Sequence, residues 1–190
     1  MRTVMMLLVA LLCLPLVASA QMPDRGIPEI RPFAGALVPT GDNRDLVKDA
    51  FLAGLSAGFE VSENLHLLGT FAWSPSREKL DLTRNRVDVY VYSVGAELQT
   101  ARGPSGERWL RPFVGLGMGG LTYHLRDISL NEKNYLAGYG SLGVELQMEK
   151  IGLRLEGRDY LHQFKGIEGN EKATVRNFTQ FMAGLSYHIW

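Results

Sequence analysis

The clearest pattern of apolar and polar positions lies at the end of the chain. From Thr179 to Ile189 the residues alternate between an unbroken apolar face and a face of small or polar residues. The apolar face consists of Phe181, Ala183, Leu185, Tyr187 and Ile189. A repeat of two residues predicts a β-strand. A strand with one apolar and one polar face suits a barrel that has lipid outside and a polar lumen inside.

Seven segments upstream show the same alternation, and polar or turn-forming residues separate them. We expect strands at about residues 29–38, 50–61, 65–73, 87–99, 109–123, 135–148 and 151–162, and a closing strand within 177–190. Most are about nine to fourteen residues long, which is enough for a tilted strand to cross a bilayer. Long connections alternate with shorter ones, as in an even-stranded barrel with long outer loops. The sequence therefore predicts an all-β fold, an eight-stranded antiparallel up-and-down transmembrane β-barrel.

The first twenty residues have the organisation of a cleaved signal peptide. Arg2 supplies the positive charge, residues 5–17 are apolar, and Ala18-Ser19-Ala20 forms an A-x-A cleavage site. We therefore divide the chain into a signal peptide (1–20), a short periplasmic lead (21–28) and a β-barrel domain (29–190). Export together with a barrel fold predicts a location in the bacterial outer membrane.

Composition excludes several classes of chemistry. Cys13, in the signal peptide, is the only cysteine, so the mature chain has no disulfide, reactive thiolate or cysteine-ligated metal. Loss of Arg2 leaves 19 basic against the 20 acidic side chains, which gives no basic field for nucleic acid. The four histidines are spread along the chain, so we expect no metal site. Gly115, Gly117 and Gly119 lie within a strand that no helix follows. We read them as sites of close packing and expect no cofactor.

Charged residues occupy the lumen face of several predicted strands, close to the inner turns. Folding each hairpin about its turn, with Thr100 opposite Arg108 in one of them, gives three acid–base pairs: Glu60 with His66, Glu97 with Arg111, and Glu145 with Arg154. We expect Arg31, Glu156 and Arg158 to extend this set. An eight-stranded barrel is just wide enough for side chains to fill it. The sequence thus predicts a plug of ion pairs, which we favour over a proton path or a catalytic dyad.

Two segments begin alike, and their spacing indicates an internal repeat. Residues 111–115 read Arg-Pro-Phe-Val-Gly, and residues 31–35 read Arg-Pro-Phe-Ala-Gly. The separation of about eighty residues corresponds to four strands, so we expect two similar halves of the barrel.

The chain resembles the small outer-membrane barrels of the OmpA/OmpX type, in the broad outer membrane protein β-barrel domain family. The resemblance covers the mature chain and rests on the stretches 111–117 (Arg-Pro-Phe-Val-Gly-Leu-Gly), 143–146 (Gly-Val-Glu-Leu) and 184–187 (Gly-Leu-Ser-Tyr). It implies a monomer in contact with outer-membrane lipid and lipopolysaccharide, delivered by periplasmic chaperones to the barrel-assembly machinery. That machinery reads a C-terminal aromatic residue together with alternate upstream positions. The corresponding insertion signal here is Leu185, Tyr187, Ile189 and Trp190, in which either Ile189 or the out-of-phase Trp190 fills the last position.

These features predict a structural or surface-interaction role in the cell envelope without enzymatic activity. Two alternatives remain open at this point. One is a lipid A-modifying enzyme at the rim, for which the candidate residues are His124, Asp127, Ser129, His162 and Glu168, although no His-x-Ser-Asn stretch of the lipid A deacylase kind occurs. The other is a narrow passive pore.

Overall fold

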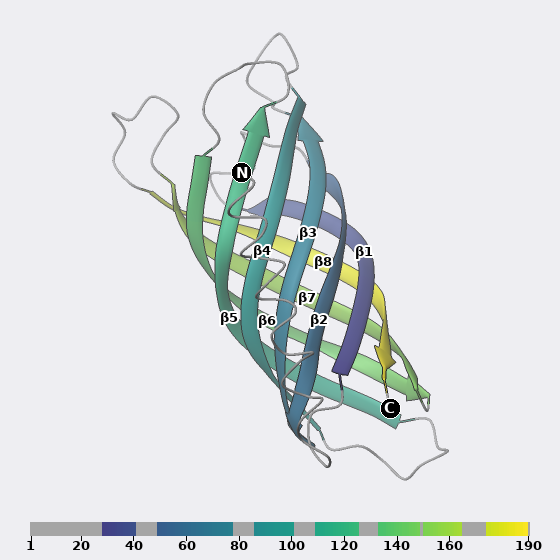
Figure 1. Ribbon diagram of the computed structural model, residues 1–190. Helices are drawn as coiled ribbons and strands as arrows, with labels where there is room; N and C mark the ends of the chain where they lie inside the picture. The colour runs from purple at the N-terminus through teal and green to yellow at the C-terminus, as the bar shows by residue number, and fades with distance from the viewer. Residues whose placement is uncertain are drawn as a thin grey trace.

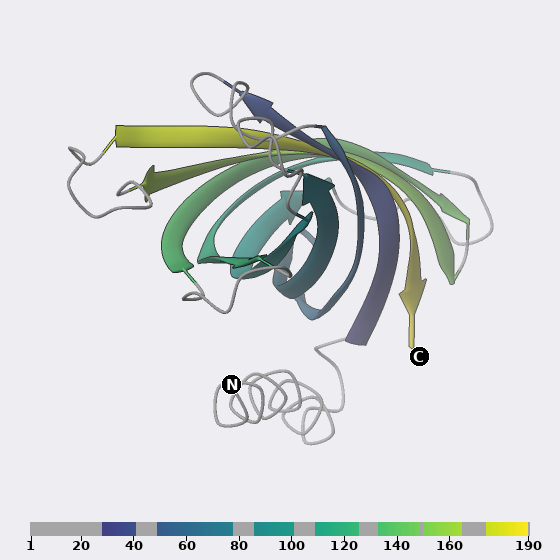
Figure 2. The same ribbon diagram turned by 90° about the horizontal axis from the view of Figure 1, so that it is seen from above.

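Eight strands close into one barrel in the computed structural model, which describes residues 28–40, 49–77, 86–100, 109–125, 133–148, 150–164 and 174–189. The strands are β1 (Pro28–Thr40), β2 (Ala50–Ser62), β3 (Leu65–Arg77), β4 (Arg86–Gln99), β5 (Trp109–Leu125), β6 (Lys133–Met148), β7 (Ile151–Phe164) and β8 (Thr174–His188). Each strand pairs antiparallel with the next, and β1 pairs antiparallel with β8 (Figures 1 and 2). The predicted eight-stranded antiparallel barrel is confirmed. The expected signal peptide, residues 1–20, lies outside the described residues.

The two ends of the barrel differ. The turn end carries the connections 63–64, 100–108 and 149–150, together with the start of β1 and the end of β8, which lie side by side (Figure 1). The loop end carries the other four connections. The strands run for 13 to 17 residues, and those that exceed the predicted ranges do so mainly at the loop end. Polar residues continue the strand pairing there, because backbone hydrogen bonds do not require apolar side chains. Thr122, for example, pairs with Asn134, and its hydroxyl donates to Asn134 Oδ1 at 2.6 Å. Among the described residues, no helix is long and apolar enough to cross a membrane.

The outer face of the barrel is apolar around its whole circumference. Every strand contributes exposed apolar side chains to this face, including Leu116, which is 74% exposed, Leu136 at 80% and Leu142 at 69%. These are the faces that the alternating pattern groups together, so the predicted division of the residues between the two faces is confirmed. The outward side chains make no contribution to a core inside the barrel.

The interior has two layers, and the sequence predicts only one of them. The half nearer the turn end contains the charged residues described below. The half nearer the loop end is an apolar layer of Leu37, Leu52, Ala72, Val89, Val91, Leu121, Ala137, Tyr139, Tyr160, Phe178 and Met182. The expectation of a small or polar lumen throughout is therefore wrong. Alternation identifies which residues share a face, but it does not require the inner face to be polar along its whole length.

The repeated Arg-Pro-Phe-x-Gly motifs occupy equivalent positions in the two halves. Phe33 on β1 lies opposite Gly54 on β2, and Phe113 on β5 lies opposite Gly143 on β6. A Cβ atom on either of these glycines would overlap the phenylalanine ring. Each motif thus places an arginine in the lumen and lays the following ring over the bare backbone of the next strand.

Candidate functional site: the ion-pair network of the lumen

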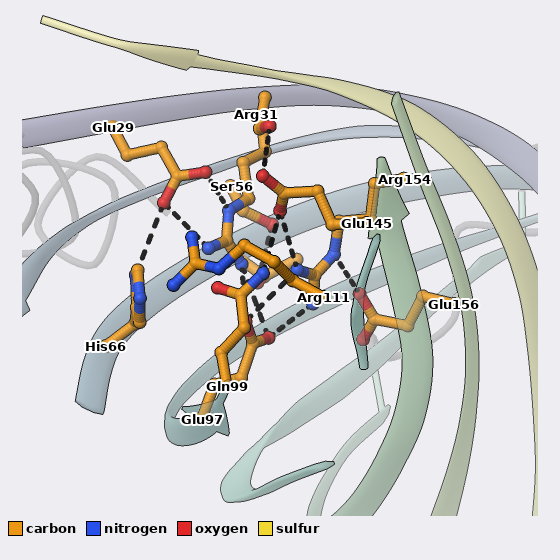
Figure 3. A network of polar contacts seen from close by, with 12 residues as sticks. Glu29, Arg31, Ser56, His66, Glu97, Gln99, Arg111, Glu145, Arg154 and Glu156 are labelled. Atoms are coloured by element: carbon orange, nitrogen blue, oxygen red, sulfur yellow. Dashed lines mark hydrogen bonds and ion pairs between the residues drawn. The ribbon is translucent and has the colours of Figure 1, made fainter. Parts of the chain in front are cut away.

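A continuous network of charged side chains fills the lumen half nearer the turn end (Figure 3). Four strands supply it: β1, β4, β6 and β7. Its members, which we call the lumen network, are Glu29, Arg31, Glu97, Glu145, Arg154, Glu156 and Arg158. Neighbours on one strand are two residues apart, and the period of two places them on the same inner face. Their side chains are at most 8% exposed, so they interact with one another rather than with bulk water.

The first part of the network joins β1 to β4. Arg31 donates two hydrogen bonds to Glu29, from Nε to Oε1 at 2.5 Å and from Nη2 to Oε2 at 2.7 Å. The remaining arm, Nη1, donates to both oxygens of Glu97 at 3.2 and 3.3 Å. One guanidinium therefore bridges two carboxylates. Such charge-assisted, two-armed contacts fix orientation as well as providing energy.

Arg154 on β7 is the centre of the network. Its Nη1 donates to Glu97 Oε1 at 3.0 Å, its Nη2 pairs with Glu97 Oε2, and its Nε donates to Glu156 Oε2 at 3.1 Å. Nη1 also lies 3.4 Å from Glu145 Oε2. The guanidinium carbon is 3.4 Å from the centroid of the Phe113 ring, so an aromatic face covers the side that carries no carboxylate.

Arg158 connects the lumen network to the apolar layer. Its Nε donates to Glu156 Oε1 at 2.8 Å, and its Nη1 donates to the Tyr160 hydroxyl at 3.3 Å. The guanidinium also lies over the ring of Tyr139, 4.4 Å from the centroid. Tyr139 packs against Tyr160, which stacks on Phe178. Polar and apolar layers therefore meet without a solvent-filled level between these residues.

Neutral side chains and backbone groups complete the turn end. Glu145 accepts hydrogen bonds from Ser186 Oγ at 3.0 Å and from Gln99 Nε2 at 3.4 Å. Arg111, which is fully buried, donates to the backbone oxygens of Thr100 and Glu63 and to Gln147 Oε1. The two backbone acceptors belong to different strand ends, so Arg111 links the end of β4 to the turn between β2 and β3.

A small cavity lies beside Arg31, Arg154 and Arg158, and its volume is about 20 Å³. That is room for about one water molecule. Side chains therefore occupy the lumen at the level of the network, as expected for a barrel of eight strands.

The predicted cross-strand pairs have different outcomes. Glu60 lies opposite His66, and Glu145 lies opposite Arg154, in the registers expected from the two tight turns. A register shift between Glu60 and Ser62 places Ser62 opposite Leu65. The pairing of Glu97 with Arg111 is wrong.

In the structure Glu97 lies opposite Gly115 on one side and His66 on the other, while Arg111 lies opposite Glu145. The pairing of β4 with β5 is shifted by four residues relative to Thr100 opposite Arg108. The connection 100–108 is longer than a tight turn and does not fix the register. An even shift keeps every residue on its face, so the alternating pattern cannot reveal it.

Several residues of the site were not predicted. Glu29 is 2% exposed and binds Arg31, although it stands at the edge of the predicted first strand. Its two-residue spacing from Arg31 was the available signal. Gln99, Ser186 and His188 also face the lumen, and the positions of their strands in the alternation place them there.

The structure also brings together a group that the sequence spacing did not indicate. One ligand atom each from Glu29, Glu145 and His188 lies within 4.8 Å of the others, and all three residues are buried. The expectation of no metal site rests on the spread of the histidines along the sequence, and it stays a prediction. Closing the barrel brings the two ends of the chain together.

The other predicted residues lie away from the network. Of the insertion signal, Leu185, Tyr187 and Ile189 face outward with exposures of 51%, 47% and 42%, and Trp190 lies outside the described residues. His124 is half-buried near the loop end, opposite Asp88. The other rim candidates, Asp127, Ser129 and Glu168 and the side chain of His162, lie outside what the structure describes.

Comparison with known proteins identifies the fold. The chain is similar to the solved structure of Neisserial surface protein A, with a TM-score of 0.62 and 12% identity over 85% of this chain and 97% of that one. It is also similar to the outer membrane protein OprG from Pseudomonas aeruginosa, with a TM-score of 0.57 and 12% identity over 87% and 97%. The attachment invasion locus protein Ail of Yersinia pestis, in complex with the heparin analogue sucrose octasulfate, gives a TM-score of 0.55 and 15% identity over 87% and 99%.

At these identities the likeness concerns the fold, that of small outer-membrane barrels. No protein-family model matches the chain, so the expected OmpA/OmpX-type family is not identified. No curated protein sequence matches it either.

Proposed function

We propose that this protein is an integral barrel of a bacterial outer membrane, that its lumen is closed to solutes, and that it acts through structural or surface contacts in the cell envelope. The observation that carries the proposal is the inverted distribution of side chains. The outer face of every strand carries large exposed apolar residues, such as Leu116 and Leu136, while the interior contains buried arginines and glutamates. In water this arrangement would be unfavourable, because apolar area would be hydrated and charge would be desolvated. In a membrane, hydrocarbon surrounds the same outer face, so its apolar side chains are not exposed to water.

The closed barrel meets the other requirement of a lipid environment. Each of the eight described strands pairs with a neighbour on both sides, including β1 with β8, so the sheet they form has no free edge strand. Lipid offers no hydrogen bonds to backbone groups, and only helices and closed barrels satisfy them internally. The signal peptide predicted from the sequence and the similarity in fold to outer-membrane barrels also support an outer-membrane location.

The side chains that fill the lumen support a barrel closed to solutes. The lumen network closes the turn-end half, and the apolar layer closes the loop-end half. A solute would have to displace both. Surface contact is therefore the mode of action we propose, through the loop end, which would face outward if both chain ends lie in the periplasm. Lipopolysaccharide phosphate groups are the partners we expect for basic loop residues.

Three measurements test this function, one on the purified protein and two on cells that express it. In planar lipid bilayers the reconstituted protein should give no discrete conductance steps, whereas reproducible steps would contradict the closed lumen and favour the pore. In cells that express the protein, lipid A should keep its mass. A change of mass that disappears in a His124→Ala variant would contradict the non-enzymatic role. Fractionation should place the protein with the outer membrane, and recovery in the soluble fraction would contradict the location.

A further inference from the structure

A buried group of oxygen and nitrogen atoms lies where the barrel closes. Glu29 on β1 stands opposite His188 on β8, and Glu145 reaches the same point from β6. Each of these residues is at most 2% exposed. Carboxylate oxygens and an imidazole nitrogen are ligands that zinc and related divalent metals use in proteins. These three residues are the candidate metal ligands.

The separations around Glu29 favour coordination over direct hydrogen bonding. Glu29 Oε1 lies 3.7 Å from His188 Nε2, and Glu29 Oε2 lies 3.5 Å from His66 Nδ1. An N–H···O hydrogen bond would be about 2.7–3.2 Å long. Two ligand atoms that are each about 2.0–2.1 Å from a tetrahedral zinc ion stand about 3.4 Å apart. The distance between Glu29 and His188 is therefore close to that of two ligands of one ion.

The charge inside the barrel also favours a bound cation. Among the described residues, the carboxylates that face the lumen outnumber the guanidinium groups by one: Glu29, Glu60, Glu97, Glu145 and Glu156 against Arg31, Arg111, Arg154 and Arg158. An uncompensated buried charge is costly. A proton on an imidazole would cancel this single excess charge. A divalent cation bound among the carboxylates would reverse it to one positive charge, unless a water molecule on the metal loses a proton.

His66 provides an independent sign that this end of the network is incomplete. It is fully buried, and neither ring nitrogen has a hydrogen-bond partner. Its ring points at Glu29 (Figure 3). Buried polar groups are normally satisfied. An ion held by Glu29 would polarise the carboxylate that the imidazole approaches, which gives His66 a role in orienting it.

We propose that Glu29, Glu145 and His188 bind one divalent transition-metal ion, for which zinc has the best-matched chemistry, and that His66 orients Glu29 from its other oxygen. Existing hydrogen bonds already hold the carboxylates, because Arg31 binds Glu29 and Ser186 donates to Glu145. Each carboxylate oxygen accepts more than one contact, so these bonds leave lone pairs for a metal. Solvent would complete the coordination.

Such an ion would link three strands. Glu29 and His188 belong to the first and last strands, and Glu145 belongs to β6, which is two strands from β8. Metal binding would therefore link the first and last strands, whose pairing closes the barrel. Since binding to the folded state alone raises stability by mass action, the metal should raise the unfolding midpoint of the barrel.

The test uses untagged chain without residues 1–20, refolded in detergent, stripped with a chelator and titrated with Zn²⁺ or Co²⁺ by calorimetry. The expected result is one equivalent bound and a higher thermal unfolding midpoint. His188→Asn should weaken binding by at least about 100-fold, and His66→Asn by about 10- to 100-fold, as for residues that orient a ligand. His124→Asn, which removes a histidine near the other end of the barrel, should leave the affinity unchanged.

A second variant separates a lost ligand from a damaged fold. His188→Cys offers a thiolate at the same position, so its Co²⁺ complex should gain a near-ultraviolet sulfur-to-metal charge-transfer band that the wild-type protein lacks. Absence of stoichiometric binding would overturn the proposal and leave a proton on an imidazole as the neutralising charge. Binding that survives His188→Asn, or a Co²⁺ spectrum without the new band in folded His188→Cys, would also overturn it.

Discussion

Arg154 and Glu97 meet across the lumen although their strands, β7 and β4, are not neighbours. Arg154 Nη1 donates to Glu97 Oε1 at 3.0 Å, and the second arm of the guanidinium pairs with Oε2. The two side chains are 5% and 2% exposed. Backbone hydrogen bonds link only adjacent strands, so this two-armed pair ties opposite walls of the barrel together directly.

Breaking this pair on one side should be strongly destabilising. Arg154→Met leaves Glu97 and its neighbours with uncompensated buried charge, so we expect a loss of about 3–5 kcal/mol in the free energy of unfolding. The measurement is urea unfolding of protein refolded into lipid vesicles. Arg154→Met combined with Glu97→Gln should cost less than the sum of the single changes, because the second change removes the stranded charge.

The matched control is Lys150→Met, which removes an exposed positive charge at the β6–β7 turn. Its cost should be below about 1 kcal/mol, as for a surface charge. If Arg154→Met proves as mild as this control, the network does not brace the barrel.

The elements that the sequence predicts well are those that the period of two determines. The strand order, the outward position of Leu116 or Leu142, and the registers next to tight turns, such as Glu145 opposite Arg154, all follow from local pattern. The partners of Glu97 do not, because an even slip of β5 along β4 changes the partner without changing the face.

The alternation of apolar and polar residues also cannot predict contacts across the lumen. They depend on the diameter and stagger of the closed barrel, which bring Arg154 to Glu97 and His188 to Glu145. The apolar layer was missed for a related reason. Val91 and Leu121 lie on the inner face, but alternation alone does not require that face to be polar near the loop end.

Close packing against bare backbone predicts a position-specific effect of adding one methyl group. A Cβ on Gly117 would overlap the ring of Tyr139, whereas a Cβ on Gly140 would meet nothing nearer than 3.8 Å. Gly117→Ala should therefore cost about 1–3 kcal/mol of unfolding free energy through overpacking. Gly140→Ala, on the outer face, should be close to neutral. Equal effects of the two substitutions would contradict the packing described for the inner face.

The two layers should block conductance independently. Arg154→Ser opens the lumen network but leaves the apolar layer, so bilayers with the folded variant should remain silent. Adding Tyr160→Ser, which removes a ring at the centre of that layer, should produce discrete conductance steps. Heat-modifiable gel migration verifies that each variant is folded. Steps from the single Arg154→Ser variant would mean that the lumen network alone closes the barrel.

Charge placed on the outer face should be penalised according to depth. Leu116 lies midway along β5, and Leu110 lies near its turn end. If hydrocarbon surrounds the barrel, Leu116→Arg should cost about 2–4 kcal/mol in vesicles and Leu110→Arg only about 0–1 kcal/mol. Equilibrium unfolding in vesicles gives both values. A penalty for Leu116→Arg no larger than that for Leu110→Arg would place this face in water.

Fluorescence quenching detects contact between the apolar outer face and lipid. Because the chain from residue 21 onward lacks cysteine, Leu116→Cys, Leu142→Cys and Lys150→Cys, made in protein without residues 1–20, each provide one site for an environment-sensitive dye. In vesicles, dyes at positions 116 and 142 should emit at shorter wavelength and be quenched by spin-labelled acyl chains, while the dye at the exposed turn position 150 should respond to a water-soluble quencher. Quenching of positions 116 and 142 by the aqueous reagent alone would show that this face lies in water.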